Sequence, residues 1–131
     1  MSDAGNIITA VTADVVAAVP GVTVGLDPIN VDNLVTIDLP HCILLLTGYS
    51  VETVGWGQEE RTWTIKGTLI VKGGTREAMQ LLLDAIRDQV FADKTLDGSV
   101  HKSVCTPLVP YSQVDSERVT GEFAVLATKT V

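Results

Sequence analysis

Two histidine–cysteine pairs are the residues best suited to bind a metal ion. His41 and Cys42 are adjacent, and His101 and Cys105 are four residues apart. Together they could supply the four ligands of a structural zinc site. Adjacent ligands chelate awkwardly, however, and Pro107 disfavours the helix that would bring residues 101 and 105 onto one face. We therefore expect two small buried thiols and two surface or capped histidines, with no metal and no cofactor.

A second candidate is the turn Gly73-Gly74-Thr75, which stands between a predicted strand and a predicted helix. Backbone N–H groups at a helix N-terminus can bind a phosphate. A P-loop also needs a Lys-Ser/Thr pair after its last glycine, and the sequence here continues with Arg-Glu. A tight turn in which Thr75 caps the helix is the simpler prediction.

Two carboxylates on the same predicted helix are the remaining candidates for catalysis. Asp84 and Asp88 are four residues apart, which places them on one face and would suit acid–base chemistry. Arg87 lies beside them, so a solvated face of paired charges is the better interpretation. The sequence also contains no Gly-x-Ser-x-Gly motif that would present a nucleophile. We therefore expect a protein without enzymatic activity.

These residues depend for their positions on a strand–turn–helix unit over residues 61–98. Residues 61–72 alternate with period two, which predicts a strand with one buried face. That face carries Trp63, Ile65, Gly67, Leu69 and Val71. In the helix that follows, apolar residues recur at helical spacing, namely Met79, Leu82, Leu83, Ile86 and Val90. We expect the helix to lie across the apolar face of the sheet, with a core that contains Trp63, Leu69, Leu82, Ile86 and Phe123.

Further helical and extended segments lie on both sides of this unit. Residues 3–19 read as a first helix, which Pro20 ends because a residue before proline is pushed out of helical geometry. Residues 33–39 and 117–130 alternate as strands. The apolar run 43–46 indicates a strand that is covered on both faces.

Residues 99–113 contain Pro107 and Pro110 and are predicted to be extended but irregular. The order of helix, strands, helix and strand then predicts a single α+β domain over residues 1–131. Its core would be a mostly antiparallel β-sheet with two helices packed on one face.

Residues 48–60 are predicted to form a loop or a long hairpin tip, because they combine three glycines, three glutamates and two aromatic residues. Trp56 stands between two glycines, outside the alternating pattern that contains Trp63. An exposed tryptophan in such a segment suits a protein interface. We expect an assembly surface that consists of Tyr49, Trp56, Glu52, Glu59 and Glu60, with the glutamates as a polar rim or as partners of basic groups. The alternative is that Trp56 folds back over the sheet edge.

The composition favours a protein that buries much of its surface against other subunits. Hydrophobic residues make up 46% of the chain and charged residues only 19%, below the usual quarter. The net charge of −7, without any basic cluster, disfavours tight nucleic-acid binding. The two cysteines form no disulfide framework, which is typical of a reduced environment. No apolar run approaches the ~18 residues that a membrane-spanning helix needs.

The chain as a whole resembles the tail terminator proteins of long-tailed bacteriophages, which are small minor tail proteins that act in head–tail joining. The likeness is carried by the first helix, a strand that ends in Leu39-Pro40, the strand with Trp63, the helix LLLDAIRDQVFAD, the turn TLDGSVHKSV and a V-x-G-x-F segment at residues 119–123. In that family the turn has the form T-L-G-G-x-V. Asp97 stands where the first of those glycines is usual, and aspartate is also tolerated in turns.

Members of this family form a ring, usually hexameric, that caps the tail tube and docks to the head connector. The resemblance therefore implies a structural virion protein of the tail or neck, which assembles in the host cytoplasm as a ring of six copies. Its partners would be the tail tube protein and the head connector or stopper protein, and DNA would pass through its lumen without tight binding. Two alternatives remain open. One is another neck component, such as a head-completion or stopper protein, and the other is a ligand-binding α+β domain with a deep pocket.

Overall fold

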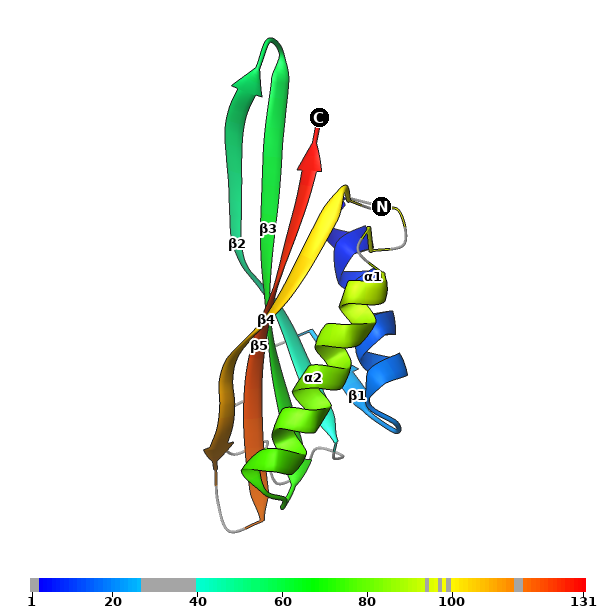
Figure 1. The fold of residues 1–131 in the computed structure, drawn as a ribbon, viewed down its shortest axis with the longest axis vertical. Coiled ribbons are helices and arrows are strands. Elements are labelled where there is room, and N and C mark those ends of the chain that lie inside the picture. The colour runs from blue at the N-terminus through cyan, green and yellow to red at the C-terminus, as the bar shows by residue number, and fades with distance from the viewer. Residues whose placement is uncertain (1–2, 27–39, 94, 97, 99, 115–116) are drawn as a thin grey trace.

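The computed structural model describes residues 3–26, 40–93, 95–96, 98, 100–114 and 117–131 (Figure 1). In chain order the elements are α1 (Asp3–Ala18), β1 (Thr23–Gly25), β2 (His41–Gly55), β3 (Gln58–Lys72), α2 (Arg76–Ala92), β4 (Lys102–Gln113) and β5 (Arg118–Thr130). The strands form one sheet in the order β1-β2-β3-β5-β4. The short β1–β2 pair is parallel, and the other pairs are antiparallel. This architecture confirms the predicted α+β fold.

Both helices lie on the same face of the twisted sheet (Figure 1). α2 packs over β4 and β5, while α1 packs beside α2 and towards β1 and β2. The apolar stripe of α2 provides the contact, because Met79, Leu83, Ile86 and Val90 are all buried. The largest of the fully buried side chains in the resulting core is that of Phe123.

The predicted core residues occupy different depths. Trp63, Leu69, Ile86 and Phe123 all lie inside the hydrophobic core. Leu82 is only partly buried and packs at the margin of the core. The neighbouring Leu83 is 1% exposed. This corrects the predicted position of Leu82. The orientation of α2 about its own axis points Leu83, rather than Leu82, into the core.

The turn before α2 has the predicted structure. Gly73 and Gly74 both have positive φ angles, of 64° and 113°, which glycine adopts without steric cost. Thr75 is the N-cap of α2, and its side-chain oxygen accepts a hydrogen bond from the backbone N–H of Ala78 at 3.1 Å. Such a cap satisfies one of the backbone donors that a helix leaves free at its first turn.

Residues 48–60 are almost entirely strand, so the predicted loop is wrong and the predicted hairpin is right. β2 and β3 pair from His41↔Ile70 to Gly55↔Gln58. This leaves a turn of two residues, Trp56 and Gly57. Gly57, the second turn residue, has a φ of 70°, which glycine adopts without steric cost. The strand pairing satisfies backbone hydrogen bonds along the whole segment, and this overrides the weak strand preference of its glycines and glutamates.

The segment with two prolines is also more regular than its sequence predicts. β4 contains Pro107 and Pro110 and still pairs with β5, with irregular register between Pro107 and Val109 and between Val109 and Ser112. β4 ends the strand order, and an edge strand tolerates proline because its outer N–H groups have no ladder partner. The predicted strand over residues 33–39 lies outside the described residues.

The apolar run 43–46 is covered on both faces only in its first half. Ile43 and Leu44 are buried, whereas Leu46 is 44% exposed. Beyond Leu46 the sheet leaves the shelter of the helices, and β2 and β3 continue as a projecting hairpin (Figure 1). None of the helices in the described part of the chain has both the length and the apolarity that crossing a membrane would require.

Candidate self-assembly surface

The outer part of the β2–β3 hairpin projects beyond the helices as an arm (Figure 1). We call residues 49–62 the arm. Its base is held by β5, which pairs with β3 up to Glu60↔Thr130. Glu59 and Val131 add two backbone hydrogen bonds, of 2.9 and 2.8 Å. Beyond that point the arm is a ribbon of two strands, and all stabilisation of its tip comes from the hairpin itself.

Large apolar side chains are exposed along the arm. Tyr49, Val51 and Val54 are each about half exposed. Trp56 at the turn is 104% exposed, so its indole makes no protective contact with the rest of the chain. Trp56 therefore does not fold back over the sheet edge. A fully exposed tryptophan has a strong tendency to become buried against another surface.

Tyr49 and Trp63 anchor the base of this arm. They are register partners on β2 and β3, and their ring centroids lie 5.3 Å apart with an interplanar angle of 42°. Trp63 is 4% exposed, whereas Tyr49 is 53% exposed. Tyr49 thus shields Trp63 on one side and offers its other side to solvent. The contact joins the folded core to the exposed surface of the arm.

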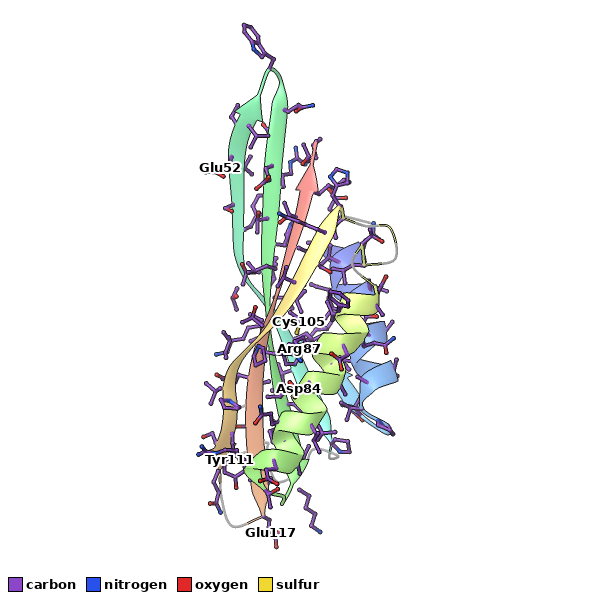
Figure 2. The ribbon with its side chains drawn as sticks, in the orientation of Figure 1. Glu52, Asp84, Arg87, Cys105, Tyr111 and Glu117 are labelled. Atoms are coloured by element: carbon purple, nitrogen blue, oxygen red, sulfur yellow. The ribbon has the colours of Figure 1, made fainter. Side chains whose placement is uncertain are left out.

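The acidic residues of the arm are not equivalent. Glu52 and Glu60 lie directly opposite one another in the β2–β3 register, and neither has an ion-pair partner among the described residues. Like charges at opposed positions in a sheet are unfavourable by roughly 0.2–1 kcal/mol. Glu59 instead forms an ion pair of 3.3 Å with Arg61. Figure 2 shows Glu52 on the outer side of the arm, far from Glu117 at the other end of the molecule.

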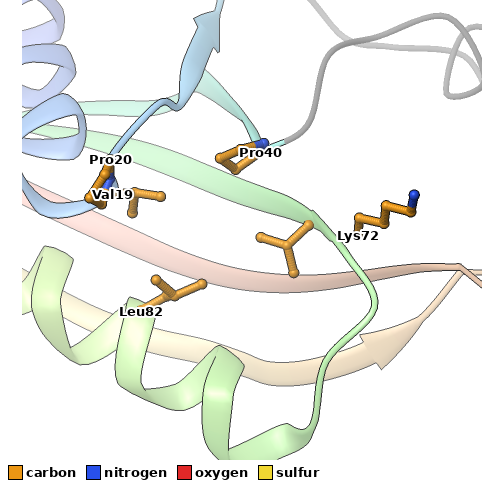
Figure 3. A pocket seen from close by; sticks show the side chains of 6 residues that line it. Val19, Pro20, Pro40, Lys72 and Leu82 are labelled. Carbon is orange, nitrogen blue, oxygen red and sulfur yellow. The ribbon is translucent and has the colours of Figure 1, made fainter.

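At that other end an open apolar groove lies between α2, the end of α1 and the end of β3 (Figure 3). We call it the basal groove. It has a volume of about 300 Å³ and is lined by Val19, Pro20, Pro40, Val71, Lys72 and Leu82. Lys72 is its one charged lining residue among those described, and it is exposed. Sequence periodicity could not reveal this groove, because its walls come from four separate segments.

The histidines and cysteines do not converge on a metal site. No group of metal-ligating side chains is found among the described residues. Cys42 and Cys105 are both buried as free thiols, and burial raises the pKa of Cys42 to about 12 and that of Cys105 to about 11. The Nδ1 atom of His101 accepts a hydrogen bond from the backbone N–H of Thr130 at 3.0 Å, while His41 is buried on β2. His101 is therefore a surface histidine held by a hydrogen bond, as predicted, whereas the burial of His41 corrects its predicted surface position.

The other chemical candidates are also accounted for by structure. The Thr75 hydroxyl accepts a hydrogen bond from the N–H of Ala78 in the first turn of α2, and the Tyr111 hydroxyl donates to the carbonyl of Gly74 at 3.5 Å. Arg87 lies 3.7 Å from Asp84 and 3.9 Å from Asp88, so the two carboxylates share a cation on the helix surface. Figure 2 shows Asp84 and Arg87 along α2, with Cys105 of β4 near Arg87, and both residues line one groove.

A comparison with protein-family models finds no match to this chain. A search of curated proteins finds no similar sequence either. The arm and the basal groove are therefore interpreted from their own physical properties.

Proposed function

We propose that the chain is a structural subunit that assembles head to tail into a closed ring at the neck of a long-tailed bacteriophage. In this role the ring would terminate the tail tube and join it to the head connector. The resemblance of the sequence to tail terminator proteins supports the location, and the exposed arm supports the assembly. The protein acts by contact and shape, without a cofactor and without catalysis.

The observation that carries the proposal is the full exposure of Trp56 at the end of a projecting hairpin. A monomer gains nothing from an indole in water, whereas tryptophan is among the strongest anchors of protein interfaces. The hairpin holds this anchor away from the core, in a position from which it can reach a neighbouring subunit. A head-to-tail contact of this kind is heterologous, and it produces a ring when the rotation between subunits closes.

A different neck component, such as a head-completion or stopper protein, is the second candidate function. It would use the same arm, because such proteins also act by docking. A ligand-binding domain has less support. Its pocket should combine apolar walls with several convergent polar groups, whereas the basal groove offers one charged residue, Lys72, among its described lining residues.

Fluorescence of Trp56 tests the proposal. In a Trp63→Phe variant, Trp56 is the only tryptophan. Its emission should be red-shifted and readily quenched in the free subunit, and it should shift to the blue when subunits assemble. The matched control is Trp56→Phe, in which the buried Trp63 should emit in the blue in both states. Emission from Trp56 that stays red-shifted in a verified assembly would contradict the proposed role of the arm.

The location in the virion needs a separate measurement. A reconstruction of particles that contain this chain should show several copies closed into a ring between head and tail. The free subunit can remain monomeric in dilute solution until the tail end provides a template. A single copy at the periphery of the particle would contradict the proposal.

A further inference from the structure

The arm and the basal groove lie at opposite ends of β3, and they cannot meet within one chain. Trp56 and Lys72 are sixteen positions apart in the chain, and β3 covers most of that span. At about 3.3 Å per residue an extended strand of that length spans roughly 50 Å. A contact between the two features therefore requires two subunits.

We infer that Trp56 of one subunit inserts into the basal groove of the next subunit. This inference rests on the proposed self-assembly and specifies the contact that produces it. The indole would pack against Val19, Pro40, Val71 and Leu82, which are the apolar walls of the groove. The inserted indole would cover Leu82, which is only partly buried in the single subunit.

The size of the groove is sufficient for an indole. A protein cavity of about 150 Å³ is enough to hold benzene, and the basal groove has a volume of about 300 Å³. An indole is a fused two-ring system, and this volume is large enough to receive it. Burial of a tryptophan removes about 150–250 Å² of surface from water, which makes the insertion favourable.

Charge also matches the arm to this groove. Lys72 lies at the rim without an ion-pair partner among the described residues. Glu52 and Glu60 repel one another behind the tip, and a lysine from the next subunit would relieve that repulsion.

Two other grooves with described lining residues fit the arm less well. One is lined by Glu77, Gln80, Leu81 and Asp84, and its two carboxylates would repel the acidic arm. The other contains Arg87 and Phe91, but Arg87 already pairs with Asp84 and Asp88. Its positive charge is therefore compensated before any partner arrives. The basal groove is the one whose charge complements the arm.

Disulfide trapping tests the contact directly. A subunit with Trp56→Cys, mixed with a subunit with Lys72→Cys at millimolar concentration to offset the loss of the Trp56 anchor, should form a covalent heterodimer under mild oxidation. A chain that carries both substitutions should form a ladder of covalent oligomers. The native Cys42 and Cys105 are buried and should not take part. Cross-linking of Trp56→Cys to itself as the main product would indicate a symmetric tip-to-tip contact and would overturn the inference.

The matched control replaces Lys72→Cys by Phe91→Cys, which is exposed and lines the competing groove at the other end of α2. It should give little cross-link with Trp56→Cys. A cross-link as efficient as that to position 72 would show that the tip has no preference for the basal groove, which would also overturn the inference.

Charge reversal tests the electrostatic part of the contact. Glu60→Lys and Lys72→Glu should each weaken association several-fold, as expected for the loss of one exposed ion pair. The double variant should recover most of that loss, because every interface again joins opposite charges. Trp56→Ser should weaken association by roughly thirtyfold, as expected for a central anchor. A double variant no better than either single variant would contradict the pairing of Glu60 with Lys72.

Failure of this inference is distinguishable from failure of the proposed function. Rings that form normally but give no cross-link between positions 56 and 72 would overturn the contact and leave the ring in place. A chain that stays monomeric up to millimolar concentration would contradict the proposed function itself.

Discussion

The ring of Phe123 on β5 lies directly over Gly67 on β3, in the space that a side chain at position 67 would fill. The two residues are register partners, and a Cβ atom on residue 67 would overlap the Phe123 ring. The glycine thus makes room for the largest fully buried side chain of the core.

Gly67→Ala should therefore destabilise the fold by about 1–3 kcal/mol, the usual cost of overpacking a core. Chemical denaturation followed by circular dichroism measures this change. Gly55→Ala is the matched control, because the nearest atom to its added Cβ is Gln58 Oε1 at 3.7 Å. Equal stability of the two variants would show that Phe123 can move aside without cost.

The depth of neighbouring leucines on α2 gives a second prediction. Leu83→Ala should cost about 2–5 kcal/mol, since Leu83 is almost fully buried against the sheet. Leu82→Ala should cost clearly less in the single subunit, because Leu82 is only partly buried. The exposed Gln80→Ala serves as the surface control. A larger loss for Leu82→Ala than for Leu83→Ala, measured by thermal or chemical denaturation, would mean that the helix is rotated differently.

The buried thiols predict low reactivity in the folded state. Desolvation raises the pKa of Cys42 from 9.0 to about 12 and that of Cys105 to about 11. At pH 8 the reactive thiolate is then roughly a thousandfold and a hundredfold less populated than in the unfolded chain. Iodoacetamide should label neither residue until the protein is denatured. An exposed cysteine introduced by Lys72→Cys should be labelled in the native state, and equally fast native labelling of Cys42 would contradict its burial.

The same shifts predict how stability depends on pH. Below about pH 9 the thiols are protonated in both states, and their contribution to stability is complete. As the pH rises from 9 towards 11–12, unfolded thiols ionise while folded ones stay neutral. The unfolded state then binds fewer protons, so the free energy of unfolding falls. A Cys42→Ala variant should show a shallower decline over that range, and an unchanged pH profile would contradict the shift.

Periodicity alone was enough to predict the central part of the fold. The alternation from Trp63 to Val71 and the apolar stripe of α2 both reflect burial against one apolar layer. Such one-sided burial appears in the sequence as a regular spacing of apolar residues. Strand pairing without burial produces a weaker sequence pattern than burial does. The arm was only partly predicted, because Gly48, Gly55 and Glu52 disfavour strands, and their conformation is imposed by hydrogen bonds to β3.

Features that depend on register could not be predicted from the sequence. Glu52 faces Glu60, and Lys72 faces Arg118, only because the strands pair as they do. The basal groove likewise brings together Val19, Pro40 and Leu82 from distant segments. The exposed position of Trp56 was foreseen from its flanking glycines, whereas the groove we infer for it required the three-dimensional arrangement.

Binding of DNA offers a test of the proposed role that does not depend on assembly. The chain has 16 acidic and 9 basic residues, so a lumen lined by its charges should not hold phosphates. Fluorescence anisotropy with labelled duplex DNA should detect negligible affinity near physiological salt. Submicromolar binding with a steep salt dependence would contradict passage of DNA without tight contact.

The molar mass of the purified chain, measured by multi-angle light scattering up to millimolar concentration, tests the central claim most directly. The proposal predicts a discrete assembly, about six times the 13.9 kDa subunit, that grows in population with concentration. It also predicts that Trp56→Ser shifts this population back to the subunit mass. A wild-type chain that remains at 13.9 kDa throughout the range would contradict the account.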